Sequence, residues 1–209
     1  MRIDKIAAKP DGVGRYRVDF EDGSFMRLYR QTIEDLCVYA GRELTEQEME
    51  LLCSHAGKTS AKMRAVRILT ASDVSRDDLR QRLIQKGESK EDAAAAVAWM
   101  EELDLVDDGR TAAIIVSRCI AKGYGLARAK QALYEKRIPK EYWDQALADY
   151  PDQTEAIVTF LQSRLKQNAD EREKKRAVDA LLRRGHSYGQ ICSAMRQIDF
   201  DEFQEDWNG

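Results

Sequence analysis

The side chains whose types and spacing could bind a charged ligand are concentrated between residues 110 and 150. This segment has eight basic and four acidic residues, whereas segments 1–59, 60–109 and 151–209 each have more acidic than basic residues. Arg118 and Lys122 are four residues apart and would share one face of a helix. Such a surface would attract nucleic-acid phosphates or an acidic protein surface. The basic residues are Arg110, Arg118, Lys122, Arg128, Lys130, Lys136, Arg137 and Lys140.

A tyrosine between two glycines lies in the middle of this basic segment. Gly123 and Gly125 predict a tight turn into the next helix, whose first backbone N–H groups could bind a phosphate. Tyr124 could stack on an exposed base. The plainer interpretation is a set of solvated lysines and arginines beside an ordinary turn between helices, and the sequence leaves both interpretations open.

Nothing in the chain has the pattern of a catalytic or metal site. The sequence lacks GxGxxG, GxxxxGK[ST], HExxH and GxSxG, and it has only two histidines. The adjacent carboxylates Asp77-Asp78 and Asp107-Asp108 are interpreted as helix caps. The four cysteines form no CxxC pair and are interpreted as small buried side chains in a reducing compartment. We therefore expect no catalytic residue, no metal, no cofactor and a cytoplasmic location.

Composition points to helices with large solvated surfaces. The 209 residues are 34 % charged, with a formal net charge of −3, a pI near 5.6 and a mean hydropathy of −0.60. Interspersed charge at this level favours small cores over one thick core. There is no apolar run of about 18 residues and no apolar segment after Met1, so neither a transmembrane helix nor a secretory signal is expected. We expect no membrane partner.

The first 58 residues have a different pattern from the rest. Alternating apolar residues predict strands at 3–8, 15–20 and 25–29, and Asp22-Gly23 between the last two is typical of a hairpin turn. Two short helices are expected within 31–56 as support for the hairpin, and Thr45 with Glu48 forms a capping box for the second. Arg15 and Arg17 lie in the second of these strands.

From residue 60 onward the sequence repeats at intervals of about 50 residues. Leu83, Leu133 and Leu181 each precede a turn position by four residues, and those turn positions are Gly87, Arg137 and Gly185. Such a period is typical of repeated helical units. The expected helices are 60–72, 75–86 and 89–104, then 111–122, 126–136 and 139–149, then 152–168, 171–184 and 188–197. A core stripe is expected along the third helix at Ala93, Ala96, Val97, Met100 and Leu103.

These patterns predict a mainly α fold made of tandem three-helix bundles in an elongated curved array. A small N-terminal extension with a β-hairpin and two helices covers 1–58. The three repeats cover 59–108, 109–150 and 151–209, and the second is the basic one.

Four short segments of the sequence resemble the RecX family, regulators of the RecA recombinase. They are residues 79–87 (LRQRLIQKG), 103–112 (LDLVDDGRTA), 118–125 (RCIAKGYG) and 132–136 (ALYEK). The resemblance covers residues 60–209, and the N-terminal region is similar to an extension found in some members. Two positions depart from the family pattern, because Thr111 stands where an aromatic residue is usual and Leu126 where a proline often follows the second glycine.

The resemblance implies a modular helical protein, without a cofactor or catalytic residue, that binds RecA in the groove of its filament on DNA. It would there block strand exchange, ATP turnover and the co-protease activity that cleaves the SOS repressor, and so regulate recombination and DNA repair. We expect a monomer that contacts single- and double-stranded DNA weakly or through RecA. The expected contact residues are Arg118, Lys122, Arg128, Lys130, Lys136 and Arg137, together with Arg15 and Arg17.

Two other functions stay open on the sequence. Short turns between helices are also typical of helix-turn-helix proteins that bind DNA directly, usually as dimers on spaced half-sites. Alternatively, the chain is an interaction scaffold whose charge serves only solubility. The sequence also leaves open whether the protein inhibits or assists recombination in the cell.

Overall fold

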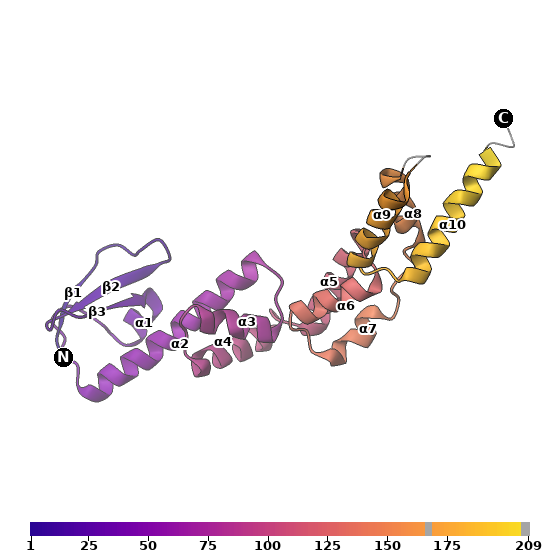
Figure 1. Ribbon diagram of the computed structural model, residues 1–209. Helices are drawn as coiled ribbons and strands as arrows, with labels where there is room; N and C mark the ends of the chain where they lie inside the picture. Colours follow the sequence, from indigo (N-terminus) through magenta and orange to yellow (C-terminus); the bar gives the residue numbers. More distant parts are fainter. Residues whose placement is uncertain (166–168, 206–209) are drawn as a thin grey trace. The chain divides into compact units, whose positions relative to one another are not determined.

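The structure, a computed structural model, describes residues 1–165 and 169–205, with side chains as far as residue 198. It is mainly α-helical with a small sheet near the N-terminus (Figure 1). The chain divides into two compact units, Met1–Asp107 and Asp108–Gly209. Each unit contains two hydrophobic cores.

The N-terminal unit begins with a three-stranded antiparallel sheet in the order β1-β2-β3. The strands are β1 (Ile3–Ile6), β2 (Arg15–Phe20) and β3 (Phe25–Tyr29). Gly23 turns the β2–β3 hairpin with a φ of 83°, which glycine adopts without a steric penalty. The predicted hairpin is confirmed, although β1 ends at Ile6 rather than at residue 8.

Two helices pack against the buried face of the sheet. They are α1 (Arg30–Asp35) and α2 (Glu46–Ala71), and the predicted capping box of Thr45 and Glu48 opens α2. The core between sheet and helices contains Leu52 of α2 together with Ile3, Val18, Phe20, Leu28, Val38 and Leu44.

The prediction of separate helices within 31–56 and at 60–72 is wrong, because α2 is one helix of 26 residues. Leu52 packs in the sheet core while Ala61, Ala65 and Ile68 pack in the next core, so tertiary contacts hold both halves of the helix. A glycine inside a helix costs only about 1 kcal/mol. A Cβ at Gly57 would lie 2.6 Å from Asp92 Oδ2, so this glycine lets the start of α4 approach. The predicted division after residue 58 falls inside α2.

The second core of the N-terminal unit lies between α2, α3 (Arg76–Gln85) and α4 (Lys90–Glu102). The hydroxyl groups of Ser75 and Ser89 accept hydrogen bonds from the backbone N–H groups of Asp78 and Asp92 and so form the N-caps of α3 and α4. The predicted core stripe is buried at Ala93, Ala96, Val97 and Met100. It is wrong at Leu103, which is 49 % exposed because it is the C-cap residue, where the helical period ends.

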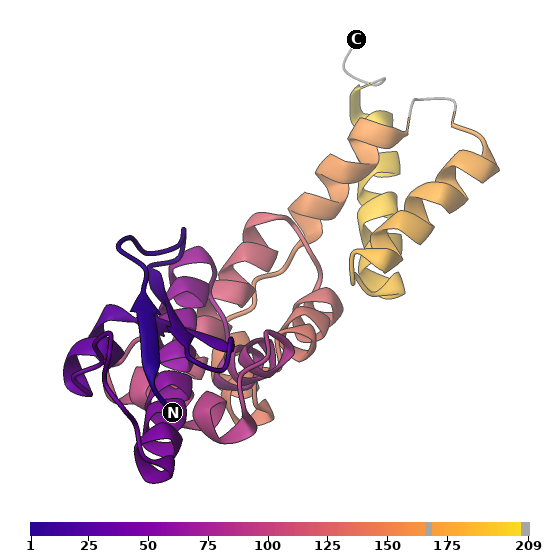
Figure 2. The ribbon, with the colours of Figure 1, turned by 90° about the vertical axis from the view of Figure 1, so that its left-hand side faces the viewer.

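The C-terminal unit contains two further groups of helices (Figure 2). The first comprises α5 (Asp108–Ala121), α6 (Leu126–Glu135), a 3-10 turn (Lys140–Tyr142) and α7 (Trp143–Leu147). The second comprises α8 (Thr154–Arg164), α9 (Glu171–Arg183) and α10 (Tyr188–Glu205). The helix expected at 139–149 is therefore shorter, and its first turn is 3-10.

The repeated leucine-to-turn pattern has one structural cause in all three places. Leu83, Leu133 and Leu181 are fully buried, and the carbonyl of each accepts a hydrogen bond from the residue five positions later. The turn positions Gly87, Arg137 and Gly185 have φ values of 93°, 55° and 88°. This is the left-handed helix ending that recurs at helix C-termini. The predicted curved array of the repeats stays a prediction.

The cysteines are only partly as expected. Cys119 is buried, and burial raises the pKa of its thiol, whereas Cys37 and Cys53 are exposed, so the interpretation of four buried thiols is wrong. Among the described residues, no three His, Cys, Asp or Glu side chains gather in a way that could hold a metal ion. No helix in the described part of the chain is both long and apolar enough to cross a bilayer.

Candidate functional site

The turn between α5 and α6 packs directly against the end of α9. The Gly125 N–H donates to the Arg184 carbonyl at 3.0 Å, and the Ala127 N–H donates to the Gly185 carbonyl at 3.3 Å. A Cβ on Gly125 would lie 2.1 Å from the Gly185 oxygen. Glycine is required at residue 125 because two backbones meet there.

Of the two interpretations that the sequence left open, phosphate binding at the start of α6 is the one that this packing contradicts. Its backbone N–H groups at Gly125 and Ala127 are already bonded to carbonyls of the α9 end. The backbone of Gly185 also occupies the space in front of the helix, since a Cβ there would lie 2.3 Å from the Arg128 nitrogen.

Two side chains complete this junction and fix the position of Tyr124. The Tyr150 hydroxyl donates to the Tyr124 carbonyl at 2.7 Å, and burial raises the pKa of Tyr150 to about 12. His186 is buried, with Nε2 3.0 Å from the Gly123 carbonyl, so this nitrogen carries the donated proton. Burial lowers the pKa of His186, which favours the neutral ring.

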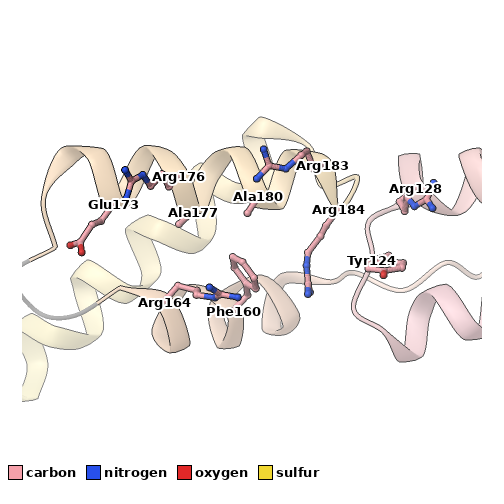
Figure 3. Close-up of a pocket in the computed structure, with 10 residues that line it drawn as sticks. All are labelled: Tyr124, Arg128, Phe160, Arg164, Glu173, Arg176, Ala177, Ala180, Arg183 and Arg184. Carbon is pink, nitrogen blue, oxygen red and sulfur yellow. The ribbon is translucent and has the colours of Figure 1, made fainter.

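Beside the junction lies a cavity of about 670 Å³, which we call the arginine pocket (Figure 3). It is formed by residues of α6, α8 and α9 and by Tyr124. Its charged lining residues are five arginines and one glutamate: Arg128, Arg164, Arg176, Arg183, Arg184 and Glu173. The cavity is of the size typical of sites for small ligands or for a segment of a larger one.

Most of the positive charge of the arginine pocket has no carboxylate partner among the described side chains. Arg128 pairs with Glu135 at 2.9 Å, which raises the pKa of the arginine and lowers that of the glutamate. Glu173 is engaged in the cap of α9, where its carboxylate accepts the Asp170 N–H at 3.2 Å. Among the side chains that the structure describes, which end at residue 198, no carboxylate forms an ion pair with the other four arginines of the pocket.

Two of these arginines face aromatic rings. The guanidinium carbon of Arg184 lies 4.8 Å from the Phe160 ring centre and 5.8 Å from that of Tyr124. Arg164 also faces Phe160, at 5.6 Å. In Figure 3, Arg184 extends from the end of α9 toward Phe160 on α8. Guanidinium groups held on aromatic faces are suited to phosphates, carboxylates and unstacked bases.

The predicted site residues are distributed over several surfaces. Tyr124 and Arg128 line the arginine pocket. Arg137 and Lys140 line a separate cavity of about 540 Å³ beside Trp143. The remaining basic residues of the second repeat line neither of these two cavities. Arg110, Arg118, Lys122 and Lys130 are exposed, and Lys136 is half-buried.

The two predicted residues of the N-terminal unit lie on β2. Arg15 pairs with Asp11 at 2.9 Å, and Arg17 pairs with Asp19 at 2.6 Å. Arg17 also faces the ring of Phe25 at 4.1 Å.

The part of the arginine pocket that comes from the third repeat is not among the residues predicted from the sequence. The acidic residues between 199 and 206 give segment 151–209 a negative total, whereas residues 151–198 alone have nine basic and six acidic side chains. The positive charge of the third repeat is therefore visible in the sequence once residues 199–206 are set apart. Arg176 and Arg183 are also seven residues apart, a spacing that places them on one helix face.

Comparison with known proteins places the chain in a family. No family model matches it. A regulatory protein RecX from Vibrio parahaemolyticus is 32 % identical over 145 residues, which are 68 % of this chain and 94 % of that protein. The chain belongs to the RecX family. The resemblance read from residues 79–136 is thereby confirmed, and the RecX relative is named a regulatory protein.

Solved RecX structures have the same fold. The crystal structure of a regulatory protein RecX matches with a TM-score of 0.62 and 20 % identity, over 92 % of this chain and 98 % of that one. RecX from Lactobacillus salivarius matches with a TM-score of 0.60 and 20 % identity, over 69 % and 97 %. The predicted mainly helical fold with a small N-terminal sheet is confirmed.

Proposed function

We propose that this chain regulates the RecA recombinase by binding the RecA–DNA filament, and that it inhibits strand exchange, ATP hydrolysis and co-protease activity. Membership of the RecX family supports this proposal. The observation that carries it is the arginine pocket, in which four arginines lack a carboxylate partner among the described residues. On this proposal the protein acts as a cytoplasmic monomer without a cofactor, within DNA repair and the SOS response.

Charge gives a physical reason for filament binding. A nucleoprotein filament presents many phosphates, and each phosphate that a Lys or Arg neutralises releases counterions, which makes binding favourable and salt-dependent. Guanidinium groups bind phosphate and carboxylate through two parallel hydrogen bonds, so the arginine pocket is suited to DNA or to an acidic surface of RecA.

The test is binding of the labelled protein to preassembled RecA filaments on single-stranded DNA, measured by fluorescence anisotropy at several salt concentrations. We expect saturable binding whose affinity falls as salt rises. Absence of binding at low salt, with the protein in excess, would overturn the proposal.

The basic residues outside the arginine pocket are tested in the same assay. We propose that Arg118, Lys122 and Lys130 contribute to the contact, so changing all three to Glu should weaken filament binding. An unchanged affinity would instead favour the interaction-scaffold alternative, in which this charge serves only solubility.

Direct recognition of DNA by a helix-turn-helix mechanism is the second candidate. It predicts sequence preference and a dimer on spaced half-sites without RecA. Binding to random and to selected duplexes should be equal if our proposal holds, whereas a strong preference for selected duplexes would favour direct recognition.

A further inference from the structure

The N-terminal unit has a cationic pocket of its own, whose lining shares no residue with the arginine pocket that carries the proposed function. It is a cavity of about 420 Å³ between the start of β2, the second half of α2, and α3 with the turn that follows it. Five cationic side chains line it: Arg15, Arg64, Arg67, Arg82 and Lys86. We call it the N-terminal pocket.

This gathering of positive charge occurs in a unit of the opposite overall charge. Residues 1–107 include 17 basic and 21 acidic side chains. Three of the pocket cations have carboxylate partners, at 2.9 Å for Arg15 with Asp11, 2.8 Å for Arg64 with Glu88 and 2.9 Å for Arg82 with Asp78.

The other two cations leave the N-terminal pocket positive. In the described ranges, no carboxylate forms an ion pair with Arg67 or with Lys86. Two uncompensated charges beside three ion-paired arginines give a net positive cavity, which favours an anionic occupant.

Neutral groups hold the arginines in place before any ligand arrives. Arg67 donates through Nη2 to the Tyr29 hydroxyl at 2.5 Å and through Nε to the Met63 carbonyl at 3.2 Å. Arg82 donates to the Ser72 hydroxyl at 3.2 Å, and Arg64 donates to the Lys86 carbonyl. Such preorganisation lowers the entropic cost of binding.

The remaining lining indicates what the occupant is. Val13, Ile68 and Ala71 supply apolar walls, and none of the residues that line this pocket is aromatic. A base would find no ring on which to stack, unlike in the arginine pocket with Phe160 and Tyr124. Several arginines around one opening are suited to tetrahedral phosphate, whereas a single carboxylate needs only one guanidinium.

We infer that the N-terminal pocket binds phosphate groups, supplied by the backbone of nucleic acid, and that it does so independently of the arginine pocket. The same chemistry could be supplied by a free nucleotide or polyphosphate. The inference does not rest on the proposed function, because it concerns binding to DNA alone, in the absence of RecA.

The experiment measures binding of a labelled single-stranded oligonucleotide and of a labelled duplex to the full chain by fluorescence anisotropy. All proteins carry Arg176→Glu and Arg183→Glu, so that the remaining affinity reports on sites other than the arginine pocket. The test variant adds Arg67→Gln and Lys86→Gln. The matched control adds Lys58→Gln and Lys90→Gln, which remove the same charge from exposed positions of α2 and α4.

We expect the test variant to lose about tenfold in affinity for the duplex and the control to change less than twofold. Each phosphate contact contributes about 0.9 to the slope of log affinity against log salt on duplex DNA, so the slope should fall by about 2 in the test variant. Equal losses in test and control variants would overturn the inference. Lys86→Gln alone in the same background leaves the contact between Arg67 and Tyr29 intact, and its affinity should fall between that of the background protein and that of the test variant.

A calorimetric titration with inorganic tripolyphosphate distinguishes the two phosphate sources. Binding of tripolyphosphate that depends on Arg67 and Lys86, without pocket-dependent oligonucleotide binding, would assign the pocket to free nucleotides and overturn the nucleic-acid source. If the test variant binds both the oligonucleotides and tripolyphosphate as tightly as the background protein, the N-terminal pocket is not a phosphate site. Either result leaves the filament proposal standing, because RecA is absent from both assays.

Discussion

His186 connects the end of α9 to the turn between α5 and α6, and its neutral ring is part of that contact. Nε2 lies 3.0 Å from the Gly123 carbonyl, whereas Nδ1 is buried and has no hydrogen-bond partner among the described atoms. A second proton on Nδ1 would therefore be buried without an acceptor. Burial lowers the pKa of His186 below the value of 6.5 that the unfolded chain has.

The lowered pKa predicts how stability changes with pH. Between the folded and unfolded pKa values the unfolded state binds more protons, so the free energy of unfolding rises with pH there. The contribution of His186 should be complete above about pH 6.5 and should be lost as the pH falls through the folded pKa. Urea unfolding at pH 7.5, 6.5 and 5.5 should show a larger loss in wild type than in His186→Gln. Parallel curves for the two proteins would contradict this assignment.

Tyr150 makes a second contact with the same turn. Removing its hydroxyl leaves the Tyr124 carbonyl without the 2.7 Å hydrogen bond, so Tyr150→Phe should lower the free energy of unfolding by about 1–2 kcal/mol. The matched control is Tyr134→Phe at a position 68 % exposed, which should change it by less than about 0.5 kcal/mol. Urea unfolding measures both changes. Equal effects would show that the hydrogen bond of the Tyr150 hydroxyl does not stabilise the fold.

At the scale of elements, Gly87 and Gly185 end two helices in the same backbone conformation but differ in how closely other atoms approach them. Gly87 and Gly185 both have φ near 90°, but a Cβ at Gly87 meets nothing within 4 Å while one at Gly185 lies 2.3 Å from the Arg128 nitrogen. Gly87→Ala should lower the free energy of unfolding by about 1–2 kcal/mol, because a residue with a Cβ is strained in the left-handed backbone conformation.

Gly185→Ala should lower the free energy of unfolding by clearly more than Gly87→Ala does, because the α9 end must also move away from α6. Chemical denaturation of the two variants gives the comparison. If both lose the same free energy, the contact between the α9 end and the α5–α6 turn does not stabilise the protein.

Local chemistry is sufficient to predict many element ends. Thr45, Ser75 and Ser89 cap helices through their own side chains, and Asp22-Gly23 forms the hairpin turn, so neighbouring residues determine these features. The length of α2 is different, because its continuity through Gly57 depends on a core on either side and on Asp92 of α4. Such tertiary contacts are not visible in a local pattern.

At the largest scale, the candidate site combines residues that a local pattern predicts with residues that only tertiary contacts bring to it. Tyr124 and Arg128 belong to a locally basic segment, and they do line the arginine pocket. Arg184 lies beside Tyr124 through a long-range contact, in which the Gly125 N–H, some 60 residues earlier in the chain, donates to the Arg184 carbonyl. That hydrogen bond also occupies the helix start that the sequence suggested for a phosphate.

The arginine pocket should act through its arrangement and not through total charge. Arg176 and Arg183 line it, whereas Arg172 and Lys175 are exposed on the same helix outside the lining. Changing either pair to Glu alters the net charge equally. A difference between the two double variants therefore measures the pocket itself.

The most direct measurement is the rate of ATP hydrolysis by RecA on single-stranded DNA, titrated with wild type and with these two double variants. We expect wild type to slow hydrolysis at substoichiometric amounts and Arg172→Glu with Lys175→Glu to do nearly the same. Arg176→Glu with Arg183→Glu should need at least about tenfold more protein for the same effect, a difference of about 1.4 kcal/mol in binding free energy. A wild-type protein that leaves the rate unchanged in excess, or two double variants that fail equally, would contradict it.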